Sequence, residues 1–245
     1  MAKHRVTIKE IAEEAGVSIA TVSYVLNNRQ DQKISDEKRK KILQLANLYN
    51  YVKNPVAASL ASGRSGLISV IFPASDNLLS KSNDWIILSR LSEAFFEKGF
   101  RVCAEYSSLP SGAGLDAIIA IGLSNSRFRE IGNNIFVPLI AVDSLIDELL
   151  FNQVSDDYDQ LSGDLISLPI TSDEYRRYLQ SRFNLIEVDS PVGIPSGPAY
   201  VRDPALISLC PGLTPIDAFS KKKIDKIVEL TIASIDGEQS SRVKI

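Results

Sequence analysis

The feature that most constrains the fold is a pair of helix signals near the N-terminus, separated by one tight turn. Thr7 and Glu10 have the spacing of a capping box, in which the two side chains satisfy amide groups at the start of a helix. Gly16 ends that helix, because glycine adopts a positive φ without strain, and Ser18 caps the next one. This spacing predicts two short helices joined by a sharp turn.

Apolar residues at helical spacing extend this head to three helices. The second helix is predicted from Ile19 to about Leu26, and the third begins after Ser35, with Asp36 and Glu37 in its first turn, where the helix dipole favours acids. The buried faces are predicted to be Ile8, Ile11, Ala12, Ala15, Val22, Val25, Leu26, Ile42, Leu45, Ala46 and Tyr49.

The formal net charge of −3 hides an asymmetry between this head and the rest of the chain. Residues 1–64 carry a balance of +5, whereas the remaining residues carry −8. A basic head on an acidic body suits a module that binds a polyanion. Surface lysines scattered without function would give the same balance, so charge alone does not decide between the two.

From Leu67 onward, the pattern changes to alternating strands and helices. Strands are predicted at 67–72, 101–106, 116–122 and 137–143, with helices at 84–98 and 124–133. This order predicts a parallel sheet with helices on both faces. Residues 150–217 are harder to interpret, with short apolar runs at 165–168 and 185–188 and many prolines and glycines from 190 to 215. A last helix is predicted at about 220–235, followed by a short tail.

Several function classes find no support in the sequence. His4 is the only histidine, so no nucleophile–base–acid set can be assembled around a second one. Cys103 and Cys210 do not make a disulfide framework, and no apolar run is long enough to span a membrane. The N-terminus lacks the apolar core of a signal peptide. We therefore expect a cytoplasmic protein that is not an enzyme and has no cofactor and no metal.

The start of the second helix has the composition of a surface that approaches DNA closely. Its small and hydroxylated side chains can donate to phosphates, its apolar ones can touch thymine methyl groups, and a tyrosine can reach a base edge. These residues are Ser18, Ile19, Ala20, Thr21, Ser23 and Tyr24. A small helical bundle that does not bind DNA is the alternative explanation.

Residues 6–27 resemble the N-terminal signature of the lac-repressor (LacI/GalR) family, and the likeness continues through 35–51 into the family's hinge at 54–61. It is close over residues 6–72, recognisable to about Asp157 and fragmentary afterwards.

The resemblance implies a helix-turn-helix DNA-binding domain at 1–52, a hinge helix at 53–65 and an α/β regulatory domain like periplasmic binding proteins at 66–245. Within the regulatory domain, it implies a first subdomain at 66–153 and a reduced second one at 154–237.

The resemblance also assigns roles to single residues. It places Ile19, Ala20 and Tyr24 at base-reading positions, and Thr7, Ser18, Thr21, Ser23 and Asn27 at phosphate contacts. It places Asn54 and Ala57 at minor-groove positions of the hinge, and Leu60 at the wedge position, where an apolar side chain opens a base step. Two departures are Tyr24, where many members carry arginine, and Lys53, where proline is usual.

The family's regulatory domain holds a small-molecule effector, here implied to be a sugar or sugar phosphate. Ser75, Asp76, Asp143 and Asp157 follow predicted strands and are candidates for the effector wall. Beyond Asp157 the chain is shorter than the family pattern. The family's Arg-x-x-Gly-aromatic segment and the strand ending in its cleft aspartate are not located, and the tail is expected to stop before the family's terminal strand.

These observations predict a repressor of carbohydrate-use genes that binds a palindromic operator as a homodimer, because one short helix reads too few bases alone. Dimer contacts are expected from the helix at 84–98, through Leu88, Leu91, Phe95 and Phe96. Two alternatives stay open: a sugar-binding protein with a vestigial head, and a DNA-binding regulator without an effector.

Overall fold

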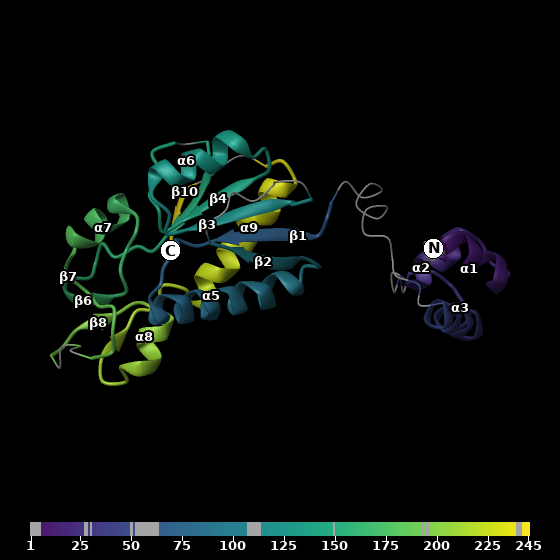
Figure 1. The fold of residues 1–245 in the computed structure, drawn as a ribbon, viewed down its shortest axis with the longest axis horizontal. Helices are drawn as coiled ribbons and strands as arrows, with labels where there is room; N and C mark the ends of the chain where they lie inside the picture. Colours follow the sequence, from purple (N-terminus) through teal and green to yellow (C-terminus); the bar gives the residue numbers. More distant parts are fainter. Residues whose placement is uncertain are drawn as a thin grey trace. The chain divides into compact units, whose positions relative to one another are not determined.

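The computed structural model describes residues 6–26, 29, 31–49, 51, 64–106, 114–148, 150–192, 194, 197–238 and 242–245. The chain divides into two compact units, Met1–Ala61 and Ser62–Ile245 (Figure 1). Each unit buries its own apolar clusters, so each has the core that a separate domain needs.

The first unit contains three helices, α1 (Ile8–Ala15), α2 (Ile19–Leu26) and α3 (Asp36–Leu48). Both halves of the predicted capping box are present, since the Thr7 hydroxyl accepts from the Glu10 amide and the Glu10 carboxylate accepts from the Thr7 amide at 2.7 Å. Gly16 ends α1 with φ 70°, as predicted. Ser35 precedes α3 in extended conformation but makes no side-chain capping hydrogen bond, so this predicted cap is wrong in its chemistry.

The core of this unit is small and is formed by all three helices. Ile11, Val22 and Ile42 are completely buried, one from each helix. Lys41 lies across the end of α1, where its Nζ donates to the carbonyl of Ala15 at 3.3 Å. Most of the predicted apolar faces are buried or packed against this core. Tyr49 is the exception, because it follows the helix and lies at the surface.

The second unit is built on a six-stranded parallel sheet in the order β10-β5-β4-β3-β1-β2. Its strands are β1 (Leu67–Ile71), β2 (Arg101–Glu105), β3 (Ala117–Ile121), β4 (Leu139–Val142), β5 (Asn152–Ser155) and β10 (Arg242–Lys244). The strand β10 pairs with β5 at the edge of the sheet, so the expectation that the tail adds no terminal strand is wrong.

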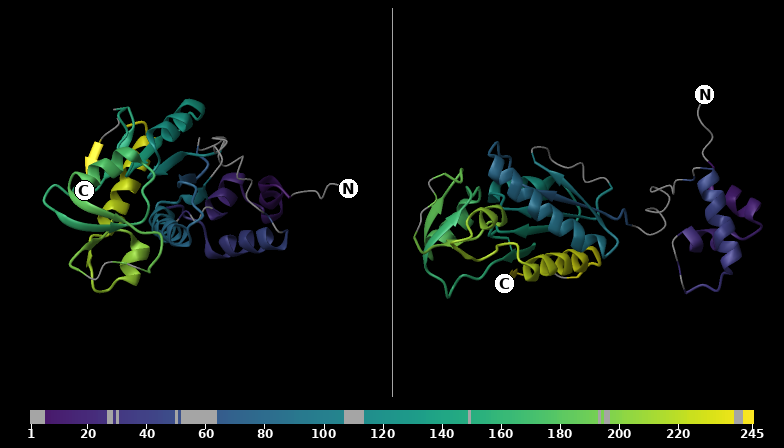
Figure 2. Two further views of the ribbon diagram at one scale, coloured as in Figure 1. Left: turned by 60° about the vertical axis from the view of Figure 1, so that its left-hand side comes forward. Right: turned by 90° about the horizontal axis from the view of Figure 1, so that it is seen from below.

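Helices cover both faces of this sheet. The helices α5 (Leu78–Phe96) and α9 (Lys221–Ile235) lie side by side on one face, and α6 (Asn125–Asn134) lies on the other (Figures 1 and 2). Alternate strand residues supply the two cores, Ile68 toward α5 and α9 and Ile118 toward α6. The helix α5 begins earlier than predicted, because Asn77 caps it by accepting from the Ser80 amide.

A second, smaller parallel sheet has the order β7-β6-β8-β9. Its strands are β6 (Gly163–Ser167), β7 (Phe183–Glu187), β8 (Tyr200–Val201) and β9 (Thr214–Pro215). The helices α7 (Asp173–Gln180) and α8 (Pro204–Leu209), which were not predicted, pack into separate apolar clusters with this sheet. The shortened segment therefore folds as a complete layered subdomain.

Candidate functional site

The first turn of α2 presents an exposed face. Ser18, Ile19 and Ala20 are all exposed, with Ile19 at 48% of its full surface, whereas Val22 and Val25 anchor the helix from behind. The Ser18 hydroxyl accepts from the Thr21 amide at 3.1 Å and lies 2.9 Å from the Thr21 hydroxyl. The local sequence thus fixes the helix start and leaves its small side chains open to a ligand.

Tyr24 lies one turn farther along α2 and has a basic neighbour. The Arg29 guanidinium lies over the Tyr24 ring, 5.8 Å from its centroid. Asp31 holds that guanidinium through two hydrogen bonds, at 2.8 and 2.7 Å. The Asp31 carboxylate balances the charge of Arg29, so the pair orients a planar guanidinium beside Tyr24 without adding net positive charge. Arg29 was not among the predicted site residues.

The remaining predicted contacts fall into two groups. Thr7 and Ser23 are described, and Thr7 is exposed at the start of α1 while Ser23 is partly exposed on α2. Asn27, Asn54, Ala57 and Leu60 lie outside the described residues.

A second candidate site is a cavity of about 240 Å³ in the body of the protein. It lies at the carboxyl ends of strands from both sheets, the position where open α/β sheets bind ligands. The first sheet contributes Pro73 after β1, Gly122 after β3 and Asp143 after β4, and the second contributes Leu168 after β6 and Arg202 after β8. Polar lining comes also from Ser75, Ser80, Asn83, Asp84, Thr171, Tyr175 and Asp203.

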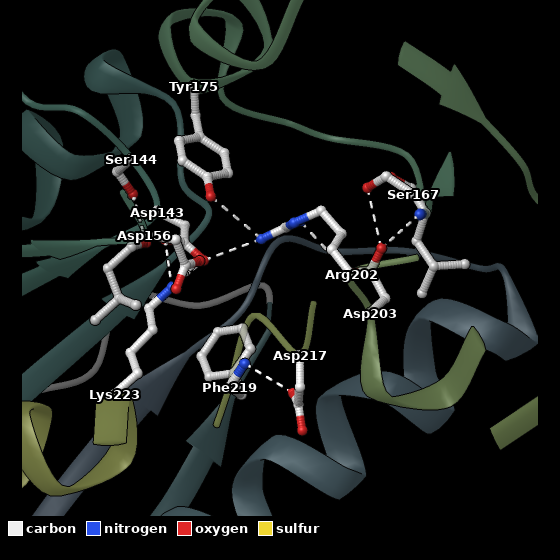
Figure 3. A network of polar contacts seen from close by, with 12 residues as sticks. Asp143, Ser144, Asp156, Ser167, Tyr175, Arg202, Asp203, Asp217, Phe219 and Lys223 are labelled. Atoms are coloured by element: carbon white, nitrogen blue, oxygen red, sulfur yellow. Dashed lines mark hydrogen bonds and ion pairs between the residues drawn. The ribbon is translucent and has the colours of Figure 1, made fainter. Parts of the chain in front are cut away.

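A buried network of charges forms one wall of this cavity (Figure 3). Lys223, at the start of α9, is completely buried, and its Nζ donates to both Asp143 oxygens at 2.7 and 2.8 Å and to Asp156 at 2.7 Å. Burial is the strongest influence on the pKa of Asp143 and raises it, whereas the Lys223 and Arg202 charges act in the opposite direction.

Arg202 joins the two sheets through this network. Its Nη2 donates to Asp143 at 3.1 Å and to the Tyr175 hydroxyl at 3.4 Å, and its Nη1 lies 3.4 Å from Asp203 (Figure 3). Asp203 in turn accepts from the Leu168 amide at 2.8 Å. Because Asp143 follows β4 and Arg202 follows β8, this ion pair spans the gap between the subdomains.

Asp84, on α5, also lines the cavity. Burial and the nearby negative charge of Asp203 raise the pKa of Asp84 to about 7. The hydroxyl of Tyr106 also has a raised pKa, through its own burial and the charge of Asp84. No described residue is a hydrogen-bonding partner of the Asp84 carboxylate.

Two of the four residues predicted for the effector wall line the cavity, and two do not. Ser75 and Asp143 line the cavity, but the Asp143 carboxylate is already bound by Lys223 and Arg202. Asp76 is fully exposed beside Lys81, and Asp157 is exposed near the C-terminal strand, so neither lies on the cavity wall. Both sit on the outer side of turns that follow strands.

Sequence reasoning missed the most informative cavity residues, namely Asp84, Tyr175, Arg202, Asp203 and Lys223. The strand β8, which Arg202 and Asp203 follow, was not predicted, because only two residues form it. One signal was available: Asp203-Pro204 is a favourable helix start after a short apolar run.

Within the described part of the chain, no cluster of three or more histidine, cysteine or acidic side chains has the arrangement of a metal site. No described helix combines the length and apolarity needed to cross a membrane.

Comparison with known proteins identifies the head. The family described as bacterial regulatory proteins, lacI family, matches residues 7–54. The catabolite repressor/activator of Escherichia coli is 28% identical over 181 residues, which cover 66% of this chain and 53% of that protein. The sucrose operon repressor of Klebsiella pneumoniae is 42% identical over 78 residues, or 31% of this chain and 23% of that protein. The chain thus spans at most about half the length of these relatives.

Solved structures show the same fold over nearly the whole chain. The lac repressor bound to ONPG in its repressed state has a TM-score of 0.62 at 17% identity, covering 98% of both chains. The head is therefore similar to the lacI family of bacterial regulatory proteins over residues 7–54, and the chain as a whole shares the fold of the lac repressor.

Proposed function

We propose that this protein is a sequence-specific DNA-binding transcription regulator that represses carbohydrate-use genes. The observation that carries the proposal is the exposed first turn of α2, in which Ser18, Ile19 and Ala20 face outward from a rigidly capped helix. The names of the relatives, a catabolite repressor/activator and a sucrose operon repressor, support the choice of carbohydrate genes. Binding to chromosomal DNA implies a cytoplasmic protein.

In this proposal, α2 enters the major groove with its N-terminal turn against the bases. Ile19 and Ala20 touch thymine methyl groups, and Tyr24 reads a base edge. The hydroxyls of Thr7, Ser18, Thr21 and Ser23, with Asn27, hold the phosphates on either side. Asn54, Ala57 and Leu60 act in the minor groove, where Leu60 wedges open a base step.

The functional unit is a homodimer. The predicted dimer helix needs a correction, because Leu91 and Phe95 are buried against the sheet and cannot meet a partner. Phe96, which was predicted, is 75% exposed, and the same helix also exposes Leu78 and Trp85, at 78% and 69%. Large exposed apolar side chains on one helix are typical of an association surface. We place the dimer contact there.

An effector binds in the cavity between the two sheets and shifts DNA affinity by binding one arrangement of the subdomains more tightly. The alternative, a regulator without an effector, has one specific observation in its favour. The ion pair between Arg202 and Asp143 joins the subdomains through the chain's own charges. A sugar-binding protein with a vestigial head is disfavoured by the intact capping and core of that head.

The test is selection of bound fragments from a random duplex library by the full chain. The proposal predicts recovery of one near-palindromic sequence, with half-sites related by two-fold symmetry. Recovery of unrelated sequences with no preferred motif would contradict it.

Three variants then assign the contacts on the recovered duplex. Tyr24→Phe should change the preferred base at one position of each half-site, because only the hydroxyl is lost. Lys38→Ala removes an exposed positive charge from α3 and should weaken all duplexes alike, since attraction to phosphates carries no sequence information. Leu60→Ala should weaken the specific duplex far more than a nonspecific one. Equal losses on both duplexes would argue against the wedge.

A further inference from the structure

The cavity in the body has an unusual balance of charge. Its charged lining consists of three carboxyl side chains and one base, Asp84, Asp143, Asp203 and Arg202. Behind the wall lie Asp156 and Lys223. The five charged side chains that are buried in the described part of the chain all belong to this network, and the acids among them outnumber the bases by one. Asp84 adds a further carboxyl at the rim.

Both bases are already committed to these acids. The Lys223 ammonium donates to both oxygens of Asp143 and to Asp156. In Arg202, Nη1 donates to Asp203, and Nη2 donates to Asp143 and to the Tyr175 hydroxyl. An anionic ligand would therefore meet more carboxylates than bases, and both bases already form ion pairs with those carboxylates. A phosphorylated sugar, with a charge near −2 at pH 7, is the least suitable occupant.

Two cavity groups have unmet hydrogen-bonding capacity. The Asp84 carboxylate has no hydrogen-bonding partner among the described residues, although it is partly buried. The Nε–H of Arg202 is buried without an acceptor in that same part of the chain, and Arg202 is only 5% exposed. Buried polar groups are nearly always paired in folded proteins. The partly exposed Asp84 carboxylate can accept from a ligand donor, best a charged one, and the buried Nε–H of Arg202 needs an oxygen acceptor.

We propose that this cavity binds a small molecule that carries a protonated amine on a hydroxyl-bearing frame of monosaccharide size, an aminohexose or a close analogue. The amine binds Asp84 and brings the positive charge that the wall lacks, and a ligand hydroxyl accepts from Arg202 Nε. The volume of about 240 Å³ is at the small end for ligand sites, which favours one sugar ring over two. The proposal rests on the proposed function only in treating this cavity as the effector site.

The groups around Asp84 favour the same ligand. Asp203 before α8 and Asp143 after β4 are the other carboxyl groups of the lining, and Arg202 is the one lining base. The raised pKa of Asp84 means that this carboxyl tends to hold a proton near neutral pH. A ligand ammonium would replace that proton and favour the ionised form.

The test is isothermal titration of the full chain at pH 7 with D-glucosamine, D-galactosamine and D-mannosamine. The matched probes are the parent hexoses, their N-acetylated amines and their 6-phosphates. At least one aminohexose should bind about tenfold or more tightly than its parent, as a charge-assisted hydrogen bond provides, with the 6-phosphates weakest. In Asp84→Asn, the affinities for the aminohexose and its parent hexose should differ by no more than about twofold.

Glu93→Gln removes one carboxylate from the exposed side of the same helix and should leave the preference unchanged. The proposal is overturned if a hexose or a hexose 6-phosphate binds as tightly as the corresponding amine. It is also overturned if the preference for the amine survives Asp84→Asn, or if no probe binds. Duplex binding by the same preparation is measured in parallel. If the preparation binds an aminohexose but shows no preference for any duplex, the result counts against the proposed function and not against the proposed ligand.

Discussion

The head and the body of this protein use polar groups in opposite ways. In the head, the groups proposed to act on α2 are exposed or partly exposed and lie within seven residues of one another, from Ser18 to Tyr24. In the body, the charged groups of the network are buried and come from distant segments, as in the contact between Lys223 and Asp143, which are 80 residues apart. A site that meets DNA needs no internal partners, whereas buried charges are stable only when they are paired.

The difference predicts where the molecule is fragile. Changes on the exposed face of α2 should alter binding with little effect on stability, because those side chains contribute little to the core. Changes in the buried network should act first on folding. The predictions that follow test this contrast.

The largest effect is expected for Lys223→Met. The substitution leaves Asp143 and Asp156 without their ammonium partner, and breaking a buried ion pair from one side costs about 3–5 kcal/mol of unfolding free energy. Urea denaturation followed by circular dichroism measures the loss. Lys222→Met, at the exposed neighbouring position, is the control. Equal stability of the two variants would show that the network does not hold the subdomains together.

A second effect concerns pH. The pKa of Asp84 is raised to about 7 in the folded chain, against 3.8 ordinarily, so between pH 4 and 7 the folded chain keeps a proton that the unfolded chain loses. Stability should therefore fall as pH rises through this window and level off above it, by about 2 kcal/mol after allowance for partial exposure. Asp84→Asn should flatten the slope relative to the unaltered chain in urea titrations at pH 5, 6, 7 and 8. A slope equal to that of the unaltered chain would contradict the assignment.

A smaller effect separates two helix starts in the head. Thr7→Ala removes the hydroxyl that accepts from the Glu10 amide and should cost about 1 kcal/mol, whereas Ser35→Ala removes a side chain that makes no capping hydrogen bond and should cost much less. Thermal unfolding of the two variants side by side gives the comparison. Similar losses would mean that the two caps differ less in solution than their geometry indicates.

The same contrast explains what the sequence could predict. The head was predictable because its signals are local: Thr7 and Glu10 are three residues apart, and Gly16 has the positive φ that the turn requires. The strands of the first sheet were predictable from their continuous apolar runs, which are typical of buried parallel strands.

The second sheet and the cavity were not predictable on these grounds. The strand β8 has two residues, too few for any periodicity, and α7 has an amphipathic pattern hidden among charged residues. Lys223 stands between Lys222 and Ile224 at the start of a helix, where a lysine is ordinarily solvated. Only the tertiary fold brings it to Asp143.

The most direct test of the central claim is an equilibrium titration of the full chain, followed by fluorescence anisotropy, against the selected duplex and a scrambled duplex of equal composition. The salt concentration is varied from 50 to 200 mM. We predict that the selected duplex binds at least about 10³-fold more tightly, and that log affinity falls linearly with log salt, by about 0.9 for each phosphate contact. Equal affinity for the two duplexes, or affinity that does not change with salt, would contradict the account.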